Sequence, residues 1–120
     1  YDFTIEVNNN DLTFEILNEE KLVIYISYNL QKFSKSSIQK MIDSSEKARE
    51  LGYKVIGLTA SSVEERNLFL KTNNVFFDFY TCDETALKTI VRSNPGAIVL
   101  NKGMVTDKKH HIDFLDLNFN

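Results

Sequence analysis

The stretch RSNPGAIVLNKGMV, residues 92–105, decides the fold, because it places the only proline of the chain directly before an apolar, β-rich run. Proline has no N–H to donate to a sheet, so Pro95 must begin a strand or lie at a sheet edge. A helix that precedes it ends at or before Asn94, since the residue before a proline avoids the α region. The runs AIVLN and MVTDK meet at Asn101-Lys102-Gly103, and this spacing predicts a β-hairpin.

Upstream of this stretch, strand-like runs alternate with segments of helical spacing. Three runs are nearly continuous in β-branched and aromatic residues, as in strands covered on both faces: KLVIYIS (21–27), YKVIGLT (53–59) and VFFDFYT (75–81). The helical segments are residues 36–52, 61–74 and 83–93. Ser36 with Gln39, and Ser61 with Glu64, predict capping boxes at the first two helices.

The N-terminal part is predicted to be a second hairpin. FTIEV and LTFEIL are β-rich and flank the turn at residues 8–10, so the hairpin would span residues 3–17. Alternating strands and helices imply parallel crossovers, whereas the C-terminal hairpin must be antiparallel. The sequence therefore predicts an α/β fold with a central mixed sheet, an N-terminal β-hairpin and helices on both faces.

Length and composition limit the possible roles. The chain has 120 residues, which predicts a single domain over residues 1–120. Its net charge is −3 without a basic stripe, so we expect no nucleic-acid partner. No apolar run reaches the roughly 20 residues that span a bilayer, so we expect no direct membrane insertion by this segment. The chain begins at Tyr1 without a methionine, and we expect it to be an excised domain of a longer protein or a processed product.

The C-terminal residues carry a resemblance to a known fold. The segment SNPGAIVLNKGMV resembles the cis-proline and last two strands of thioredoxin-like proteins, and residues 77–105 resemble peroxiredoxin and TlpA-like proteins. DETALKTIVRSNPGAIVL resembles the C-terminal domain of bacterial DoxX-type membrane proteins. The resemblance spans residues 12–108, although the tryptophan expected after the last strand is missing. It implies a thioredoxin-like three-layer sandwich and a cis bond between Asn94 and Pro95.

The reactive cysteine of thioredoxin-like enzymes is missing. The resemblance places it between the first core strand and the first long helix, which corresponds to Ser27–Ser37, and this segment has no cysteine. A dithiol oxidoreductase needs two thiols and a thiol peroxidase needs one, so we expect neither activity at this position.

Serine and histidine offer no replacement for the thiols. Ser34, Ser36 and Ser37 lie near the helix start, but a serine nucleophile needs a base within reach. The only histidines, His110 and His111, lie far along the chain, so helix capping is the better interpretation of the serines. Adjacent residues on a strand point to opposite faces, so we expect no metal site at the two histidines.

The acidic residues near the third helix have a structural explanation. Asp83 fits the N-cap, although Thr81 paired with Glu84 fits as well. Asp78, Asp83 and Glu84 also suggest a cation site, but a helix N-terminus favours negative charge and accounts for the last two. We therefore expect no metal ion here.

The single cysteine, Cys82, is the remaining redox candidate. It precedes the third predicted helix, whose N-terminus favours a thiolate, while Asp83 and Glu84 disfavour one. An intramolecular disulfide is impossible with one cysteine. A redox-sensing role for Cys82 is the alternative, and a small loop residue is the default interpretation.

The aromatic residues of the run 75–81 have two possible roles. Alternation places Phe77 and Phe79 on one face of the strand, and Phe76 and Tyr80 on the other. Core packing is the expected role for both sets. An exposed aromatic face beside the proline turn would instead be a docking surface.

Together these features favour a non-enzymatic domain that binds a partner without a cofactor. Through the resemblance, the partner would be a membrane domain of the same full-length chain, or another protein, and the protein would be bacterial and membrane-associated. An extended peptide could pair beside a proline turn. The expected binding surface consists of Tyr28, Asn29, Leu30, Gln31, Lys32, Phe33, Ser93, Asn94 and Pro95. The rival hypothesis is a one-cysteine redox protein that uses Cys82.

Overall fold

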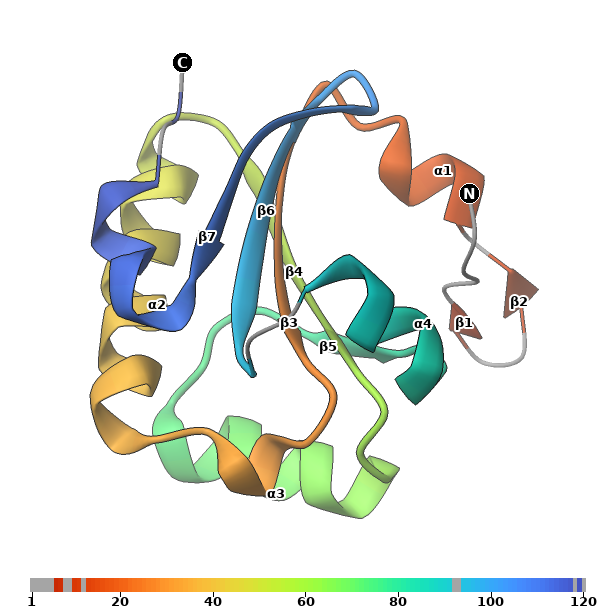
Figure 1. Cartoon of the computed structure of the whole chain (residues 1–120), viewed down its shortest axis with the longest axis vertical. Coiled ribbons are helices and arrows are strands. Elements are labelled where there is room, and N and C mark those ends of the chain that lie inside the picture. Colours follow the sequence, from red (N-terminus) through yellow and green to blue (C-terminus); the bar gives the residue numbers. More distant parts are fainter. Residues whose placement is uncertain (1–5, 8–9, 12, 92–93, 118, 120) are drawn as a thin grey trace.

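The computed structural model describes residues 6–7, 10–11, 13–91, 94–117 and 119, as strands and helices that alternate along the chain (Figure 1). The elements are β1 (Glu6–Val7), β2 (Asn10–Asp11), α1 (Thr13–Leu17), β3 (Lys21–Ser27), η1 (Leu30–Lys32), α2 (Lys35–Glu50), β4 (Lys54–Thr59), α3 (Val63–Asn73), β5 (Phe79–Thr81), α4 (Glu84–Ile90), β6 (Gly96–Asn101), β7 (Met104–His110) and η2 (His111–Asp116). No helix in these ranges is long and apolar enough to cross a membrane.

The strands form one mixed sheet in the order β2-β1-β5-β4-β3-β6-β7. β3 pairs in parallel with β4 and antiparallel with β6, so the two halves of the chain meet at this strand. The turn between β6 and β7 has positive φ at Lys102 and Gly103, which matches the right-handed twist of a two-residue hairpin. The predicted mixed sheet and C-terminal hairpin are confirmed.

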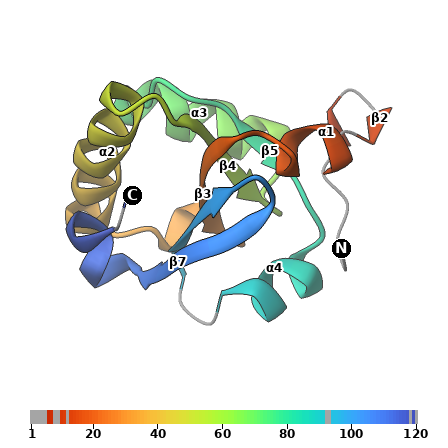
Figure 2. The same cartoon turned by 90° about the horizontal axis from the view of Figure 1, so that it is seen from above.

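Helices cover both faces of the sheet (Figure 2). On one face, Tyr25 of β3 belongs to a core cluster with Met41 of α2, Phe69 of α3 and Phe114 of η2. On the other face, Ile24 of β3 belongs to a second cluster that includes residues of α1 and α4. The near-continuous apolar sequence of β3 is explained by this double burial.

The N-terminal hairpin prediction is wrong over residues 13–17, where the chain forms α1. The hairpin consists of β1 and β2 alone, while residues 3–5 lie outside the described part of the chain. Asp11 Oδ1 accepts hydrogen bonds from Thr13 N at 2.9 Å and from Thr13 Oγ1 at 2.6 Å, which starts a helix instead of a second long strand. These two bonds, the side-chain bond foremost, lower the pKa of Asp11.

The capping box predicted for α2 is also wrong. Ser34 is the N-cap and accepts a hydrogen bond from Ser37 N at 3.2 Å, so the helix begins before Ser36. Gln39 donates to Asp43 Oδ1 at 2.9 Å, one turn further along the same helix. Ser34 serves as the cap because its backbone is extended, whereas Ser36 already lies inside the first turn of the helix.

The capping box of α3 lies one residue later than predicted. Ser62 and Glu65 form it, with Glu65 N donating to Ser62 Oγ at 3.2 Å. Ser61 Oγ instead accepts a hydrogen bond from Leu30 N at 3.0 Å, in a different loop. Ser61 is therefore committed to a tertiary contact that helix-capping patterns do not reveal.

The third predicted helix and the strand before it are present with shorter limits, while β6 and β7 are longer than predicted, and η1 and η2 were not predicted. Asp83 is the N-cap of α4, with Ala86 N donating to its Oδ2 at 3.1 Å. α4 ends at Ile90 and β5 is limited to Phe79–Thr81. The Asn94–Pro95 peptide bond is cis, as the resemblance implied.

Candidate functional site

The sequence resemblance places the thiols of thioredoxin-like enzymes in the loop between β3 and α2. Pairing of Ile26 with Gly96 places the end of β3 beside the proline turn that begins β6. In Figure 1 both segments lie at the lower edge of the sheet. The fold therefore brings the two predicted parts of the binding surface together.

The Asn94 side chain connects the proline turn to this loop. Its Oδ1 accepts hydrogen bonds from Ser27 Oγ at 2.8 Å and from Asn29 N at 3.5 Å. Its Nδ2 donates to Asn29 O at 3.1 Å. Asn29 Oδ1 in turn accepts from Gln31 N at 3.0 Å and caps η1. A continuous polar network therefore occupies the position expected for a redox centre.

Two predicted binding residues belong to the core. Leu30 is 3% exposed and Phe33 is 6% exposed, and the Phe33 ring lies 5.4 Å from that of Phe69 of α3. The expectation that Phe33 is an exposed docking residue is wrong, because η1 folds the loop back onto α3. Phe33 and Leu30 anchor the loop instead of offering contact area to a partner.

Four of the other predicted residues are more accessible. Tyr28 and Asn29 are half-buried, and Gln31 and Lys32 are exposed. The Nζ of Lys88 lies 4.8 Å from the centre of the Tyr28 ring, so α4 contacts this ring through a cation–π interaction. Pro95 is buried, and Ser93 lies outside the described residues.

The serines at the start of α2 act as structural groups. Ser34 Oγ donates to Ser37 Oγ at 2.8 Å while accepting from the Ser37 backbone, as an N-cap does. β6–β7 pairing sets the His110 backbone opposite Gly96, closer to the proline turn than its place in the sequence suggests. The side chains of residues 110–113 lie outside the described part of the chain.

Cys82 lies after β5 and is 3% exposed. Its backbone N donates to Thr59 O at 3.0 Å, which continues the pairing between β4 and β5. The side chain belongs to the core cluster beneath α4, together with Leu87 and Val91. Cys82 is therefore a core residue and not an exposed loop cysteine. Where side chains are described, no group of three or more His, Cys, Asp or Glu residues is placed to hold a metal ion.

The aromatic run 75–81 packs mainly inward. Phe77 and Phe79 are buried and their ring centres are 5.6 Å apart. Phe76 is 40% exposed, and the guanidinium of Arg49 lies 4.2 Å from its ring centre. The core role is confirmed for Phe77 and Phe79, and it is wrong for Phe76, which is exposed and lies against a cation.

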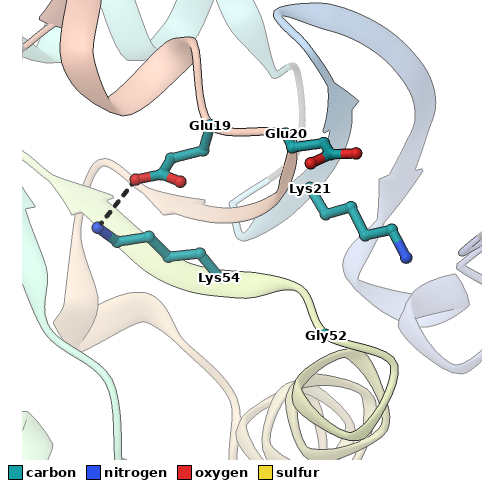
Figure 3. Close-up of a pocket in the computed structure, with 5 residues that line it drawn as sticks. All are labelled: Glu19, Glu20, Lys21, Gly52 and Lys54. Atoms are coloured by element: carbon teal, nitrogen blue, oxygen red, sulfur yellow. Dashed lines mark hydrogen bonds and ion pairs between the residues drawn. The ribbon is translucent and has the colours of Figure 1, made fainter.

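A hollow of about 370 Å³ lies at the opposite end of the sheet, where β3 and β4 begin (Figure 3). It is lined by Glu19, Glu20, Lys21, Gly52 and Lys54. Lys54 Nζ pairs with Glu19 Oε1 at 3.4 Å, and both side chains are about half exposed. Exposed ion pairs of this kind contribute about 0–1 kcal/mol to stability. The charged side chains that line the hollow therefore need no ligand to explain them.

Comparisons with known proteins support the fold. No protein-family model matches the chain, and no curated protein matches it. Among solved structures, the thioredoxin domain of a thiol-disulfide oxidoreductase from Bacteroides vulgatus matches with a TM-score of 0.68 at 10% identity, covering 94% of this chain and 86% of that one. A thiol:disulfide interchange protein from Bacteroides sp. matches with a TM-score of 0.69 at 10% identity, covering 93% and 78%.

A third similar structure is reduced Prx3 from Vibrio vulnificus, with a TM-score of 0.66 at 10% identity, covering 88% of this chain and 79% of that one. At such low identity the similarity shows the fold alone. Three-dimensional similarity over most of the chain, a mixed sheet covered on both faces and the cis-proline turn agree: this protein has a thioredoxin-like fold with a single cysteine outside the usual catalytic loop.

Proposed function

We propose that this protein is a redox-inactive thioredoxin-like domain that acts as a binding or accessory module. The observation that carries the proposal is the content of the loop between β3 and α2. Ser34 caps α2 at the helix start, where a thiol would lie, and Asn94 bonds Ser27 and Asn29 where the loop leaves β3. Burial of Cys82 beneath α4 supports the same conclusion, because a reactive cysteine needs access to its partner.

The proposed partner is a membrane domain that belongs to the same full-length bacterial chain, of the kind found in DoxX-type proteins. The sequence resemblance over residues 83–100 motivates this proposal. The proposed contact surface is the accessible part of the loop after β3, namely Tyr28, Gln31 and Lys32, next to the proline turn. Leu30 and Phe33 hold this surface in place from the core side.

The absence of redox chemistry is tested by two activity assays on the domain. Insulin reduction with dithiothreitol and peroxide consumption with a thiol donor are both expected to stay at the buffer rate. Cys82→Ser is the matched variant. Activity above buffer that survives Cys82→Ser would overturn the proposal, whereas activity abolished by this change would support the one-cysteine alternative.

The proposed partner is tested by co-purification of the full-length chain split at the domain boundary. Gln31→Ala combined with Lys32→Glu is expected to weaken capture of the membrane part, because both side chains lie on the proposed surface. Lys108→Glu on β7 is the charge-matched control and is expected to leave capture unchanged. Equal capture by all three proteins, or a native gene without an upstream membrane segment, would contradict this partner.

A further inference from the structure

Asn29 lies in an extended conformation, with φ −142° and ψ 106°, two residues beyond the end of β3. Both of its backbone polar groups are bonded to one side chain from the other half of the chain. Asn29 N donates to Asn94 Oδ1 at 3.5 Å, and Asn29 O accepts from Asn94 Nδ2 at 3.1 Å. The first bond is long and the second has an ordinary length. Together they form a reciprocal pair, in which one side chain both accepts from and donates to the backbone of Asn29.

A reciprocal pair of this kind is characteristic of antiparallel strands. In an antiparallel ladder, one residue donates its N–H to a partner and accepts the N–H of the same partner. A carboxamide carries the same donor and acceptor as a peptide group. The Asn94 side chain therefore satisfies Asn29 as a residue of a neighbouring strand would.

The backbone of Asn29 fixes the orientation of this amide. Asn29 N can only donate and Asn29 O can only accept, so Asn94 Oδ1 faces the first and Asn94 Nδ2 the second, and Ser27 Oγ donates to the same Oδ1 at 2.8 Å. Ser27 is fully buried at the end of β3, and Asn29 and Asn94 are half-buried. The reciprocal pair consequently lies at the border between the core and the accessible surface.

We propose that the Asn94 side chain is an internal latch that occupies the backbone-pairing position of Asn29, and that removing it opens this position to an extended peptide. This inference rests on the proposed binding function and adds the chemistry of the ligand, which is a peptide in β conformation. The latch competes as a tethered group, whose effective concentration is on the order of millimolar or higher. A free peptide therefore binds the closed protein more weakly than the open one.

The experiment titrates acetyl-Thr-Val-Thr-methylamide into ¹⁵N-labelled protein and follows the backbone amides by NMR. The compared proteins are the unchanged domain, Asn94→Ala and Asn94→Asp, with Asn101→Ala as the control. Asn101 bonds Thr106 within the β6–β7 hairpin, so its loss removes an asparagine bond remote from Asn29. Asn94→Asp keeps the acceptor for Ser27 but removes the donor to Asn29 O.

Asn94→Ala is expected to bind the peptide at least roughly tenfold more tightly than the unchanged domain, with the largest shift at the Asn29 amide. Asn94→Asp is expected to bind with intermediate affinity, and Asn101→Ala like the unchanged domain. If Asn94→Ala does not fold, the latch is tested by whether Asn94→Asp binds the peptide more tightly than the unchanged domain.

Equal affinities across the series, undetectable binding by every folded variant, or shifts centred away from Asn29 would overturn the latch. These outcomes differ from failure of the proposed function. Thiol activity of the unchanged domain would refute the redox-inactive module without affecting the latch, and a failed titration would leave the inactive loop as described.

Discussion

Replacing Phe33 by alanine tests whether the loop after β3 is core or docking surface. The side chain is 6% exposed and packs against the Phe69 ring at 5.4 Å, so its loss leaves a cavity that η1 and α3 cannot easily fill. Buried phenylalanine-to-alanine changes cost about 3–5 kcal/mol. This is a large part of the 5–15 kcal/mol that stabilises a typical domain, so we expect a folded but weakened protein.

The assay is urea unfolding followed by circular dichroism, with thermal melts in parallel. Phe14→Ala is the matched control, because Phe14 of α1 is 71% exposed and loses the same atoms. We expect a change within about 0.5 kcal/mol for the control. For Phe33→Ala we expect a decrease in melting temperature of roughly 10–25 °C. A loss below about 1 kcal/mol, similar to that of Phe14→Ala, would refute the core assignment.

Three further predictions concern stability. Gly57→Ala is expected to destabilise the protein by about 1–3 kcal/mol in urea unfolding, because an added Cβ would overlap the Phe79 ring; an unchanged midpoint would contradict this close packing. Burial raises the pKa of Tyr25 despite its hydrogen bond to Ser44, so its contribution to stability is complete below the unfolded pKa of about 10 and is lost as pH rises above it. The fall in unfolding free energy between pH 8 and pH 11 should therefore be smaller for Tyr25→Phe than for the unchanged protein. An equal fall in both proteins would contradict the raised pKa of Tyr25. Ser62→Ala is expected to cost about 1 kcal/mol through loss of the α3 capping box, measured by the same unfolding assay, and a neutral effect would show that the cap is unimportant.

Local patterns in the sequence predict most of the secondary structure. The apolar runs of β3 and β4 indicate double burial, and both strands lie inside the sheet. The turn at Lys102-Gly103 and the N-cap at Asp83 depend on residues close in sequence, and both are confirmed. These features follow from steric and hydrogen-bonding preferences that act over a few residues.

Short segments are decided less reliably by the same patterns. The run LTFEIL fits a strand by composition, yet the bonds between Asp11 and Thr13 begin a helix there. Neighbouring serines are nearly equivalent as caps, so the sequence does not separate Ser61 from Ser62. The choice depends on Leu30, whose backbone N–H bonds Ser61 from another loop.

The candidate site depends mainly on tertiary structure. The missing cysteines are evident from the sequence, and they exclude thiol chemistry in the loop after β3. Burial of Phe33 is not evident from the sequence, and neither is the pairing of Asn29 with Asn94. The two asparagines are 65 residues apart and meet only when β6 pairs with β3. Periodicity records which side of an element faces the core, but it carries no information on which loops lie side by side. The order of strands in the sheet decides which loops lie side by side. Here it places the Asn94 side chain, which precedes the proline, against the backbone of Asn29.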